Sequence, residues 1–433
     1  MALPAQPINV SASSSQVPKG KYLIPFILVT SLFFFWGFMH SLDGVLIPHL
    51  RKTFQLTYLE SSLVDSAVFA AYFLMALPAG FVMRKYGFKT GIIIGLFLFS
   101  IGCLLFLPAA NTNQYGFFLG ALFVGASGLT FLETAANPYA TVLGDPATST
   151  QRLNFAQSFN GLATLVAPFI GGKLILSGTE HTKEQLAAMT PADLATYLQS
   201  EADRVKGPYL TLGIILLVVA IIFIITKMPD SRDKSEAGSG FGKILRFPHL
   251  RGAVVAQFFY VGAQVCVASF LINVLKRTVN MDEKTASQYL GFGYGTAFVV
   301  GRFAGTFIMK YVSPQRLLGI YSIINIALCV VVIFSSGMVT AYALIAIAFF
   351  MSIMFPTIFA LGIKGLNDTD TKMGSSLIVM SIVGGALLPP VLGFISDHTN
   401  IQYGYIVPLI CFLVVAWYGF YGYRVKIADT TNV

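Results

Sequence analysis

One carboxylate in a long apolar stretch has a position that suits proton transfer. In "GLTFLETAANPYATVLG", residues 128–144, Glu133 is the only charged residue, and the next basic residue along the chain is Arg152. If this stretch crosses a membrane, the charge costs roughly 3 kcal/mol on insertion scales, so it should face a cavity or a partner. A glutamate that is neutral when sealed from water and ionised when wetted can carry a proton. The alternative is a permanently protonated residue that bonds a neighbouring helix.

A second carboxylate lies in the first apolar stretch. Asp43, in "FFFWGFMHSLDGVLIPHL", follows His40 by one helical turn. Asp43 could bind a hydroxyl-rich ligand, gate a path or take a proton. Because a glycine and Pro48 follow, the residue could instead cap a local irregularity of the helix.

A buried cation is the third charge of this kind. Arg302, in "VVGRFAGT", lies within the apolar run 286–310, closer to the cytoplasmic end of that run. The guanidinium could pair with Glu133 or another acid, or bind backbone carbonyls that hold two parts of the molecule together. We therefore predict a gating or structural charge at Arg302.

Uncharged polar side chains accompany these charges at helical spacing. Residues three apart lie on one face of a helix. Amides donate and accept hydrogen bonds, which suits sugar hydroxyls, and an aromatic ring can cover the C–H face of a sugar. For each amide alone an interhelical hydrogen bond is the simpler interpretation, but the faces together favour a ligand cavity. The candidate substrate-binding residues are Trp36, His40, Asn137, Gln157, Asn160, Tyr260 and Gln264, with Asn154 and Gln257 on the same two faces.

The elements that must position these residues are membrane-spanning helices. The 433-residue chain is 55% hydrophobic and 11% charged, whereas about a quarter of a soluble protein is charged. A bilayer core takes about 20 helical residues to cross, and no run alternates as a barrel strand would. The sequence predicts an all-α membrane protein with twelve spans: 22–48, 62–84, 88–109, 115–143, 152–177, 208–227, 250–276, 286–310, 315–335, 339–364, 373–396 and 403–423.

The net charge of +9 follows the predicted topology and does not indicate nucleic-acid binding. With the N-terminus in the cytoplasm, inner segments hold 18 of the 28 Lys and Arg residues and outer segments hold nine. The positive-inside rule then places both termini inside, as an even number of spans demands. The polar, Ser-rich start lacks the pattern of a signal peptide. We expect a multi-pass protein of a bacterial inner membrane.

The chain divides into two similar halves. "AGFVMRKYG" from Ala79 matches "AGTFIMKYV" from Ala304, "NPYATVLG" echoes "FPTIFALG", and "APFIGG" resembles "PPVLGF", each pair at the same place in its half. Two parallel six-helix repeats are a transporter architecture with a substrate site between them near the midplane. The predicted parts are a cytoplasmic tail 1–21, a first half 22–227 with an outer loop 178–207, a linker 228–249, a second half 250–424 and a tail 425–433. Within the outer loop, Thr190 is a possible N-cap of a short helix.

Enzyme and metal sites lack a sequence signature. The chain contains no P-loop, no H-E-x-x-H and no G-x-S-x-G motif. The four cysteines lie within predicted spans and suggest no disulfide, and the five histidines are not at metal-ligand spacing. We expect no enzyme activity, no cofactor and no metal, with a proton gradient as the driving force and a sodium gradient as the alternative.

Longer motifs resemble one family. "SLFFFWGFMHSLDGVLIPHL", "LETAANPYATVLG", "RLNFAQSFNG", "AQFFYVGAQ", "GRFAGT", "MSIMFPTIFALGIKGL" and "GSSLIVMSIVGGALLPPVLGFISD" are similar to the fucose:proton symporter family of the major facilitator superfamily, from about Tyr22 to the last span. The resemblance implies a major facilitator fold of two pseudo-symmetric halves, and uptake of a sugar with a proton by alternating access. It also implies that Glu133 is the protonated residue, and that Trp36, Gln157 and Asn160 belong to the sugar pocket.

The chain departs from the family at one position. The fucose carriers typically have Asn-Asp on the first span, whereas the matching pair here is Asp43-Gly44. The carboxylate therefore sits one residue earlier, about 100° around the helix. The shift leaves open whether Asp43 replaces the family aspartate, which falls at Gly44, and which sugar is carried.

These observations predict a sugar:proton symporter that binds a monosaccharide and a lipid bilayer and acts as a monomer. Glu133 and Asp43 are the predicted proton-coupling residues. A sodium-coupled carrier of glucose, galactose or N-acetylglucosamine is the first alternative, and it would need several oxygens around one of these carboxylates. A membrane receptor or scaffold that does not transport is the alternative from another class, and retention of both carboxylates argues against it.

Overall fold

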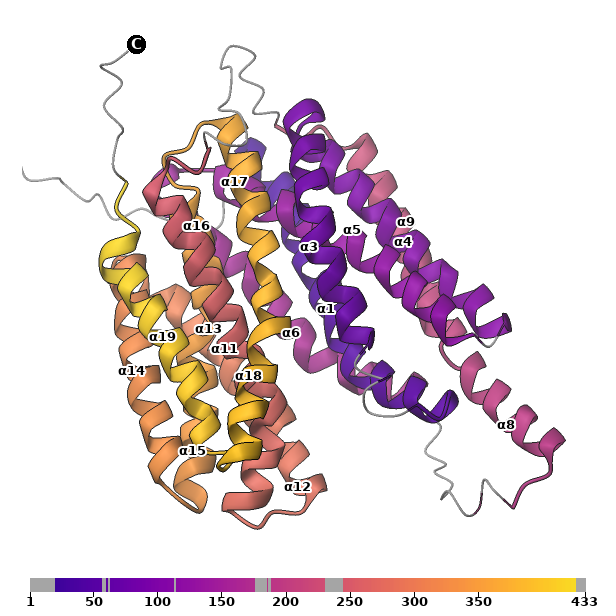
Figure 1. The fold of residues 1–433 in the computed structure, drawn as a ribbon. Helices are drawn as coiled ribbons and strands as arrows, with labels where there is room; N and C mark the ends of the chain where they lie inside the picture. The colour runs from indigo at the N-terminus through magenta and orange to yellow at the C-terminus, as the bar shows by residue number, and fades with distance from the viewer. Residues whose placement is uncertain are drawn as a thin grey trace, which may run out of the picture.

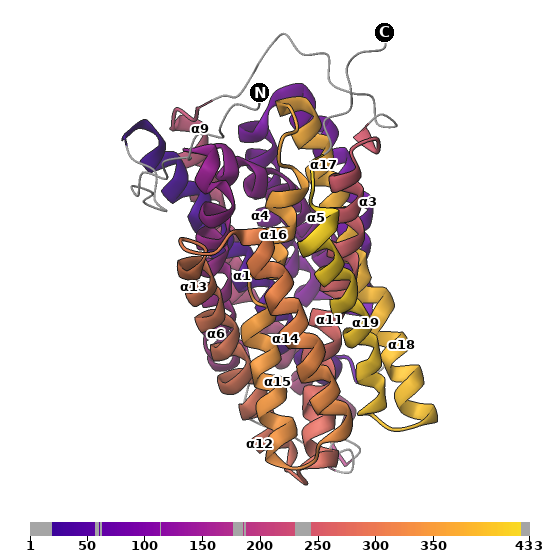
Figure 2. The ribbon, with the colours of Figure 1, turned by 90° about the vertical axis from the view of Figure 1, so that its left-hand side faces the viewer.

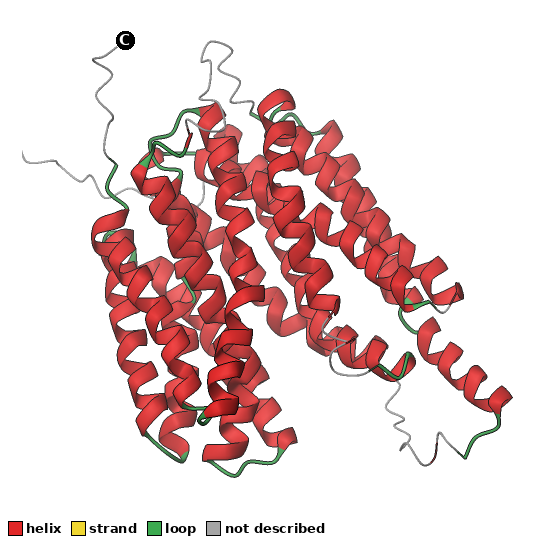
Figure 3. Ribbon diagram, in the orientation of Figure 1, coloured by secondary structure: helices red, strands yellow, loops and turns green. Residues whose placement is uncertain are grey.

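The described part of the molecule is built from helices. The computed structural model describes residues 20–56, 60, 63–112, 114–175, 185, 188–229 and 244–425, and in these ranges the regular structure is α-, 3₁₀- or π-helical (Figure 3). Most of the predicted tail 1–21, linker 228–249 and tail 425–433 lies outside these residues. All-helical structure suits a membrane because a helix satisfies its own backbone hydrogen bonds.

The first group of helices runs from Leu23 to Ile225, and its members pack on one another. Extensive contacts join the first spanning helix to the fifth, and the third spanning helix to the fourth and the sixth. The elements are η1 (Gly20–Tyr22), α1 (Leu23–Thr53), α3 (Leu63–Tyr86), α4 (Phe88–Thr112), α5 (Tyr115–Val142), η2 (Pro146–Thr148), α6 (Ser149–Ile175), α8 (Pro191–Asp203) and α9 (Lys206–Ile225).

The second group follows with α11, which begins at Pro248, close to the predicted start of the second half. Its elements are α11 (Pro248–Thr278), α12 (Glu283–Gln288), η3 (Tyr289–Gly295), α13 (Thr296–Ile308), α14 (Pro314–Phe334), α15 (Met338–Met351), α16 (Met354–Gly362), α17 (Asp368–Met380), η4 (Ser381–Val383), α18 (Gly384–His398), η5 (Tyr403–Tyr405), α19 (Ile406–Trp417) and η6 (Tyr418–Gly422). The two groups stand side by side as two bundles (Figures 1 and 2).

Eleven of the twelve predicted spans appear among the described residues as helices long and apolar enough to cross a membrane. The remaining one, 286–310, is also helical, because α12, the π-helical η3 and α13 follow one another without a gap, but it is less apolar than the other eleven. Gly291, Gly293 and Gly295 lie in η3, and glycine weakens a regular helix. π-helical turns are frequent at functional sites, and η3 lies two turns from Arg302.

The predicted cap in the outer loop is confirmed. Thr190 Oγ1 accepts a hydrogen bond from Asp193 N at 3.2 Å, and α8 follows with Pro191 at its first turn. A threonine N-cap and a proline at the first helical position both favour helix formation. The helix docks through Glu201, whose backbone oxygen lies 3.1 Å from His49 Nε2 on α1.

The two bundles meet at one end and diverge at the other. We call the end where α9 stops and α11 starts the linker end, and the end with α8 and α12 the far end. At the linker end α17 lies against α3 and α5, and α6 lies against α13 and α16, whereas α8 and α12 are far apart (Figure 1). Gly80 allows the α3–α17 approach, because a Cβ there would collide with Ser376 Oγ. The fold is therefore closed at its linker end.

Candidate functional site

The centre of the site is Glu133, in the C-terminal half of α5. Its side chain is 6% exposed. Tyr72 of α3 is its hydrogen-bonding neighbour, and Arg302 of α13 interacts with it electrostatically from the other bundle. The carboxylate thus lies where helices of both halves approach each other, which suits a group that must respond to their relative movement.

Asn137 ties the Glu133 turn to α6. The amide is fully buried, and Nδ2 donates to Glu133 O at 2.9 Å. Its Oδ1 accepts a hydrogen bond from Gln157 Nε2, also at 2.9 Å. Both ends of this amide are therefore used within the protein, so Asn137 orients Gln157 in this arrangement.

Arg302 bridges the two halves through backbone oxygens. Nη1 donates to Gln157 O at 2.6 Å, and Nε donates to Ser352 O at 2.8 Å. The guanidinium carbon also lies 4.7 Å from the centre of the Phe298 ring. No ion pair within 4.0 Å joins Arg302 to Glu133, although both are described. The sequence left two arrangements for Arg302, an ion pair with an acid or hydrogen bonds to backbone carbonyls. The structure shows the second.

Local sequence explains why Ser352 O is available. The tenth span breaks at residues 352–353, between α15 and α16. Pro356 stands four residues after Ser352 and has no N–H to donate to its carbonyl. A buried carbonyl needs another donor, and Arg302 supplies it.

The predicted polar face of α6 contacts four other helices. Asn154 Nδ2 lies 3.2 Å from Thr357 Oγ1 on α16, and Gln157 contacts Asn137 and Arg302 as above. With the Asn160 amide oriented to satisfy its partners, its oxygen accepts from Trp36 Nε1 on α1 at 2.6 Å. This face of α6 therefore connects several helices by hydrogen bonds, and Trp36 and Asn160 are in contact there.

The predicted face of α11 is only partly joined to this cluster. Tyr260 is fully buried, packs edge-on against Phe355 at 6.4 Å and interacts electrostatically with Arg302. Gln257 is also fully buried, and Gln264 is half-buried further along α11. Tyr260 is therefore the residue of this face that reaches the centre.

Two candidates on α1 stand apart from these bonds. His40, one turn beyond Trp36, is exposed. Asp43 lies within α1, but its side chain falls outside the part that the structure describes. The predicted residues that the structure brings together are Trp36, Glu133, Asn137, Gln157, Asn160, Tyr260 and Arg302.

Sequence reasoning missed two partners of this cluster. In the sequence Tyr72 stands among apolar residues, so no polar pattern marks it as a partner of Glu133. Ser352 contributes only a backbone oxygen, which residue type does not reveal. The proline in "MFPTIF" was the available signal for the second, because it marks a carbonyl without its helical donor.

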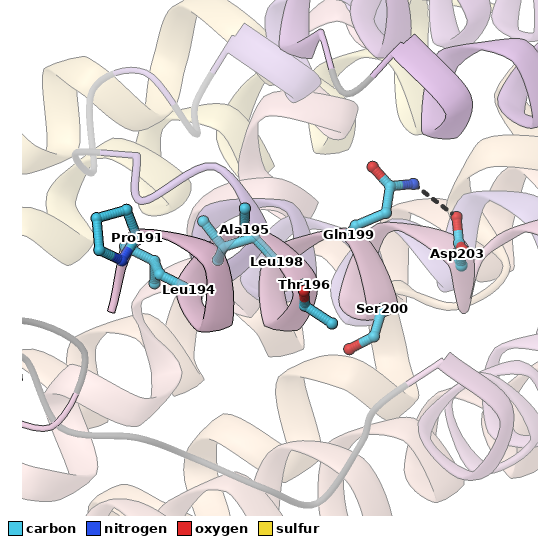
Figure 4. A pocket seen from close by; sticks show the side chains of 8 residues that line it. All are labelled: Pro191, Leu194, Ala195, Thr196, Leu198, Gln199, Ser200 and Asp203. Carbon is cyan, nitrogen blue, oxygen red and sulfur yellow. Dashed lines mark hydrogen bonds between the residues drawn. The ribbon is translucent and has the colours of Figure 1, made fainter. Parts of the chain in front are cut away.

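A separate hollow of about 830 Å³ lies over α8, lined by Pro191, Leu194, Ala195, Thr196, Leu198, Gln199, Ser200 and Asp203 (Figure 4). Its polar side chains are bonded within the protein: Gln199 Nε2 donates to Asp203 Oδ1 at 2.8 Å, and the Thr196 and Ser200 hydroxyls donate to backbone oxygens of their own helix. The hollow is far along the chain from the cluster and has no part in it. Among the described residues, no group of three or more His, Cys, Asp or Glu side chains is placed to hold a metal ion.

Comparison with known proteins agrees with this geometry. Residues 27–382 match the family model described as Major Facilitator Superfamily. The chain is 42% identical to the L-fucose-proton symporter of Escherichia coli, over 91% of this chain and 92% of that protein. It is 40% identical to the glucose/galactose transporter of Brucella abortus, over 96% and 97%. A crystal structure of a superfamily transporter in the outward conformation is similar with a TM-score of 0.85, at 41% identity, over 92% of this chain and 98% of that one.

Proposed function

This chain belongs to the major facilitator superfamily, and we propose that it carries L-fucose or a related monosaccharide across a membrane together with a proton. The observation that carries the proposal is the position of Glu133, a buried carboxylate beside Arg302 where the two halves approach each other. No ATP-binding motif is present in the sequence, so an ion gradient is the fitting source of energy.

The proton step follows from the cost of enclosing a charge. With the far end open, Glu133 takes a proton and the sugar enters between the halves. A neutral carboxyl group is cheaper to seal in an apolar site than a carboxylate. The loaded halves then rock, open at the linker end and release both ligands. Each ligand must bind the two states with different affinity, or no coupling arises.

Sugar binding is assigned to the polar residues around this carboxyl. Trp36 offers a ring face, and Gln157, Asn160, Tyr260 and Gln264 offer amide and hydroxyl groups. We assign His40, which is exposed one turn along α1, to the route of entry. Asn137 acts by holding Gln157, since its own amide is already bonded at both ends. Asp43 remains a second proposed proton-coupling residue.

The substrate has a second candidate. Relatives at 40% identity are named glucose/galactose transporters, which favours glucose or galactose about as strongly as the symporter relatives favour L-fucose. A sodium ion in place of the proton would need several oxygen ligands around Asp43 or Glu133. Dependence of uptake on sodium, with none on pH, would identify that version.

We place the protein in a bacterial inner membrane as a monomer, with the linker end and both termini in the cytoplasm. The excess of Lys and Arg in the segments at that end supports this orientation. Labelling of a cysteine introduced at Arg84, which is exposed near the end of α3, with an impermeant reagent tests it. The site should react in inside-out vesicles and stay protected in intact cells.

The proposed function is tested with purified protein in liposomes that hold a pH dye. L-fucose, galactose, glucose and N-acetylglucosamine are added in turn, with and without sodium. One sugar should drive proton movement without sodium. If labelled sugar exchanges while no proton moves under any condition, the transport part stands and the proton part fails. Absence of any exchange would support a receptor or scaffold.

A further inference from the structure

We propose that Tyr294, on the π-helical turn η3, is a sugar-binding residue contributed by the second half, and that its hydroxyl selects for one ring hydroxyl of the sugar. The proposal rests on the proposed function, because it adds a specificity-determining residue to the same sugar site. Residue spacing did not indicate it, since Tyr294 stands among glycines and apolar residues.

Glycines on both sides of Tyr294 let η3 approach two neighbouring helices closely. A Cβ at Gly293 would lie 2.9 Å from Ile345 Cδ1 on α15, and a Cβ at Gly295 would lie 3.1 Å from Leu165 Cδ2 on α6. Because α6 belongs to the first half, η3 lies where the two halves meet. Within η3, Tyr294 is the residue whose side chain is buried.

The Tyr294 ring extends a stack of side chains that ends at the candidate sugar site. It lies nearly parallel to the Phe298 ring, with the ring centres 6.3 Å apart and the planes at 9°. The Arg302 guanidinium carbon lies 4.7 Å from the centre of the Phe298 ring, and Arg302 Nη1 donates to Gln157 O on α6. Residues four apart share one face of a helix, so Tyr294 lies on the face that reaches α6 at Gln157.

The Tyr294 hydroxyl is free to bind a ligand. It is buried and has no hydrogen-bond partner among the described residues, and the side chain interacts electrostatically with Tyr260 and Arg302. A buried hydroxyl without a partner costs free energy, and few such groups occur in folded proteins. A sugar hydroxyl held between the halves supplies the bond that the protein does not.

Two other tyrosines of the second half show what distinguishes Tyr294. The hydroxyls of Tyr405 and Tyr418 are also buried without a partner among the described residues, but both side chains are fully buried, whereas Tyr294 is 9% exposed. Tyr418 packs against Gly252 and Gly362, inside the second half. Of the three, Tyr294 is the one that combines partial exposure with a place beside Arg302.

A hydroxyl in this position determines specificity as well as affinity. A site that hydrogen-bonds a substrate hydroxyl rejects an analogue that lacks it, because the buried group of the protein is then left unpaired. The Tyr294 hydroxyl should therefore discriminate at one carbon of the sugar ring and be indifferent to changes at the others.

The test measures sugar binding to the purified protein by tryptophan fluorescence, since Trp36 lies in the candidate site. The ligands are L-fucose, galactose and derivatives of each that lack one ring hydroxyl. Tyr294→Phe removes the hydroxyl and keeps the ring that stacks on Phe298. Tyr418→Phe is the matched control, because it also removes a buried, unpartnered hydroxyl from the second half.

Tyr294→Phe should lower the affinity for the intact sugar about tenfold, the cost of one buried hydrogen bond. One derivative should bind the parent about tenfold more weakly than the intact sugar and bind Tyr294→Phe as well as it binds the parent. Every other derivative should lose about tenfold in affinity through the substitution. Thermal stability without sugar should stay the same or rise, because an unpaired hydroxyl is removed, and Tyr418→Phe should change no affinity.

Two outcomes would overturn the inference and leave the proposed function standing. If Tyr294→Phe binds every ligand like the parent, the hydroxyl contacts water and no sugar. If the substitution weakens all ligands equally and lowers thermal stability, the hydroxyl acts through the fold. A parent that binds none of these sugars, nor glucose or N-acetylglucosamine, would overturn the proposed function itself and this inference with it.

Discussion

The Arg302 guanidinium connects two backbone oxygens that belong to different halves. Its planar fork allows Nε to reach Ser352 O while Nη1 reaches Gln157 O. A lysine ammonium is a compact point charge and does not offer two donors at that spacing. The charge next to Glu133 and the geometry of the bridge can therefore be separated by substitution.

Arg302→Lys should lower sugar counterflow about tenfold and leave the folded protein in detergent, because the charge stays while one charge-assisted hydrogen bond is lost. Counterflow in liposomes and size-exclusion chromatography check both parts. Arg316→Lys, at an exposed position at the start of α14, is the control and should behave like the parent. Normal counterflow in Arg302→Lys would show that the charge alone suffices.

The Asn137 amide gives a second prediction at this scale. Asn137→Leu leaves Gln157 Nε2 without its acceptor, so Gln157 should lose its fixed orientation. We expect sugar affinity to fall about five- to tenfold, the cost of one buried hydrogen bond, with little change in the maximal rate. Tryptophan fluorescence during sugar titration measures the affinity. An unchanged affinity would mean that Gln157 does not bind sugar.

Elements were predicted more readily than partners. The spans follow from long apolar runs, and the cap at Thr190 from residue types alone. Spacing placed Asn154, Gln157 and Asn160 on one face of α6, but it could not show that each contacts a different helix. Partners depend on how helices cross, and this is decided by packing between distant parts of the chain.

The break between α15 and α16 supports a prediction at the scale of the element. Pro356→Ala restores an N–H that can bond Ser352 O within the helix and compete with Arg302. Thermal stability should stay the same or rise, while counterflow should fall severalfold. Pro314→Ala is the control, because Pro314 lies at the first turn of α14, where no helical bond is missing. Lower stability together with normal transport would contradict this account of the break.

At the scale of the molecule, the two halves form a structure closed at the linker end. The repeat predicted two similar units, and the sequence motifs predicted their superfamily. Neither could predict which end is closed, because that depends on a small free-energy difference between two packings of the same helices. The contacts of α3 with α17 and of α6 with α13 supply that information.

The close approach at Gly80 predicts a change of state. Gly80→Ala adds a Cβ that collides with Ser376 Oγ, so the closed linker end should lose about tenfold in population to the open form. Spin labels on Ala147→Cys, just before α6, and Tyr311→Cys, just after α13, measure the distance across the linker end. Adding Ser376→Gly removes the colliding atoms and should restore the parent distribution. If the double variant stays open, the collision is not the cause.

The central claim is that Glu133 carries the proton that accompanies the sugar. The most direct measurement compares the parent with Glu133→Gln in liposomes that hold a pH dye, with labelled sugar followed in parallel. The account predicts that the parent moves protons when sugar is added, and that the variant exchanges sugar but moves no protons, because an amide of similar size cannot ionise. Proton movement of normal size in Glu133→Gln would contradict the account and assign Glu133 a structural role.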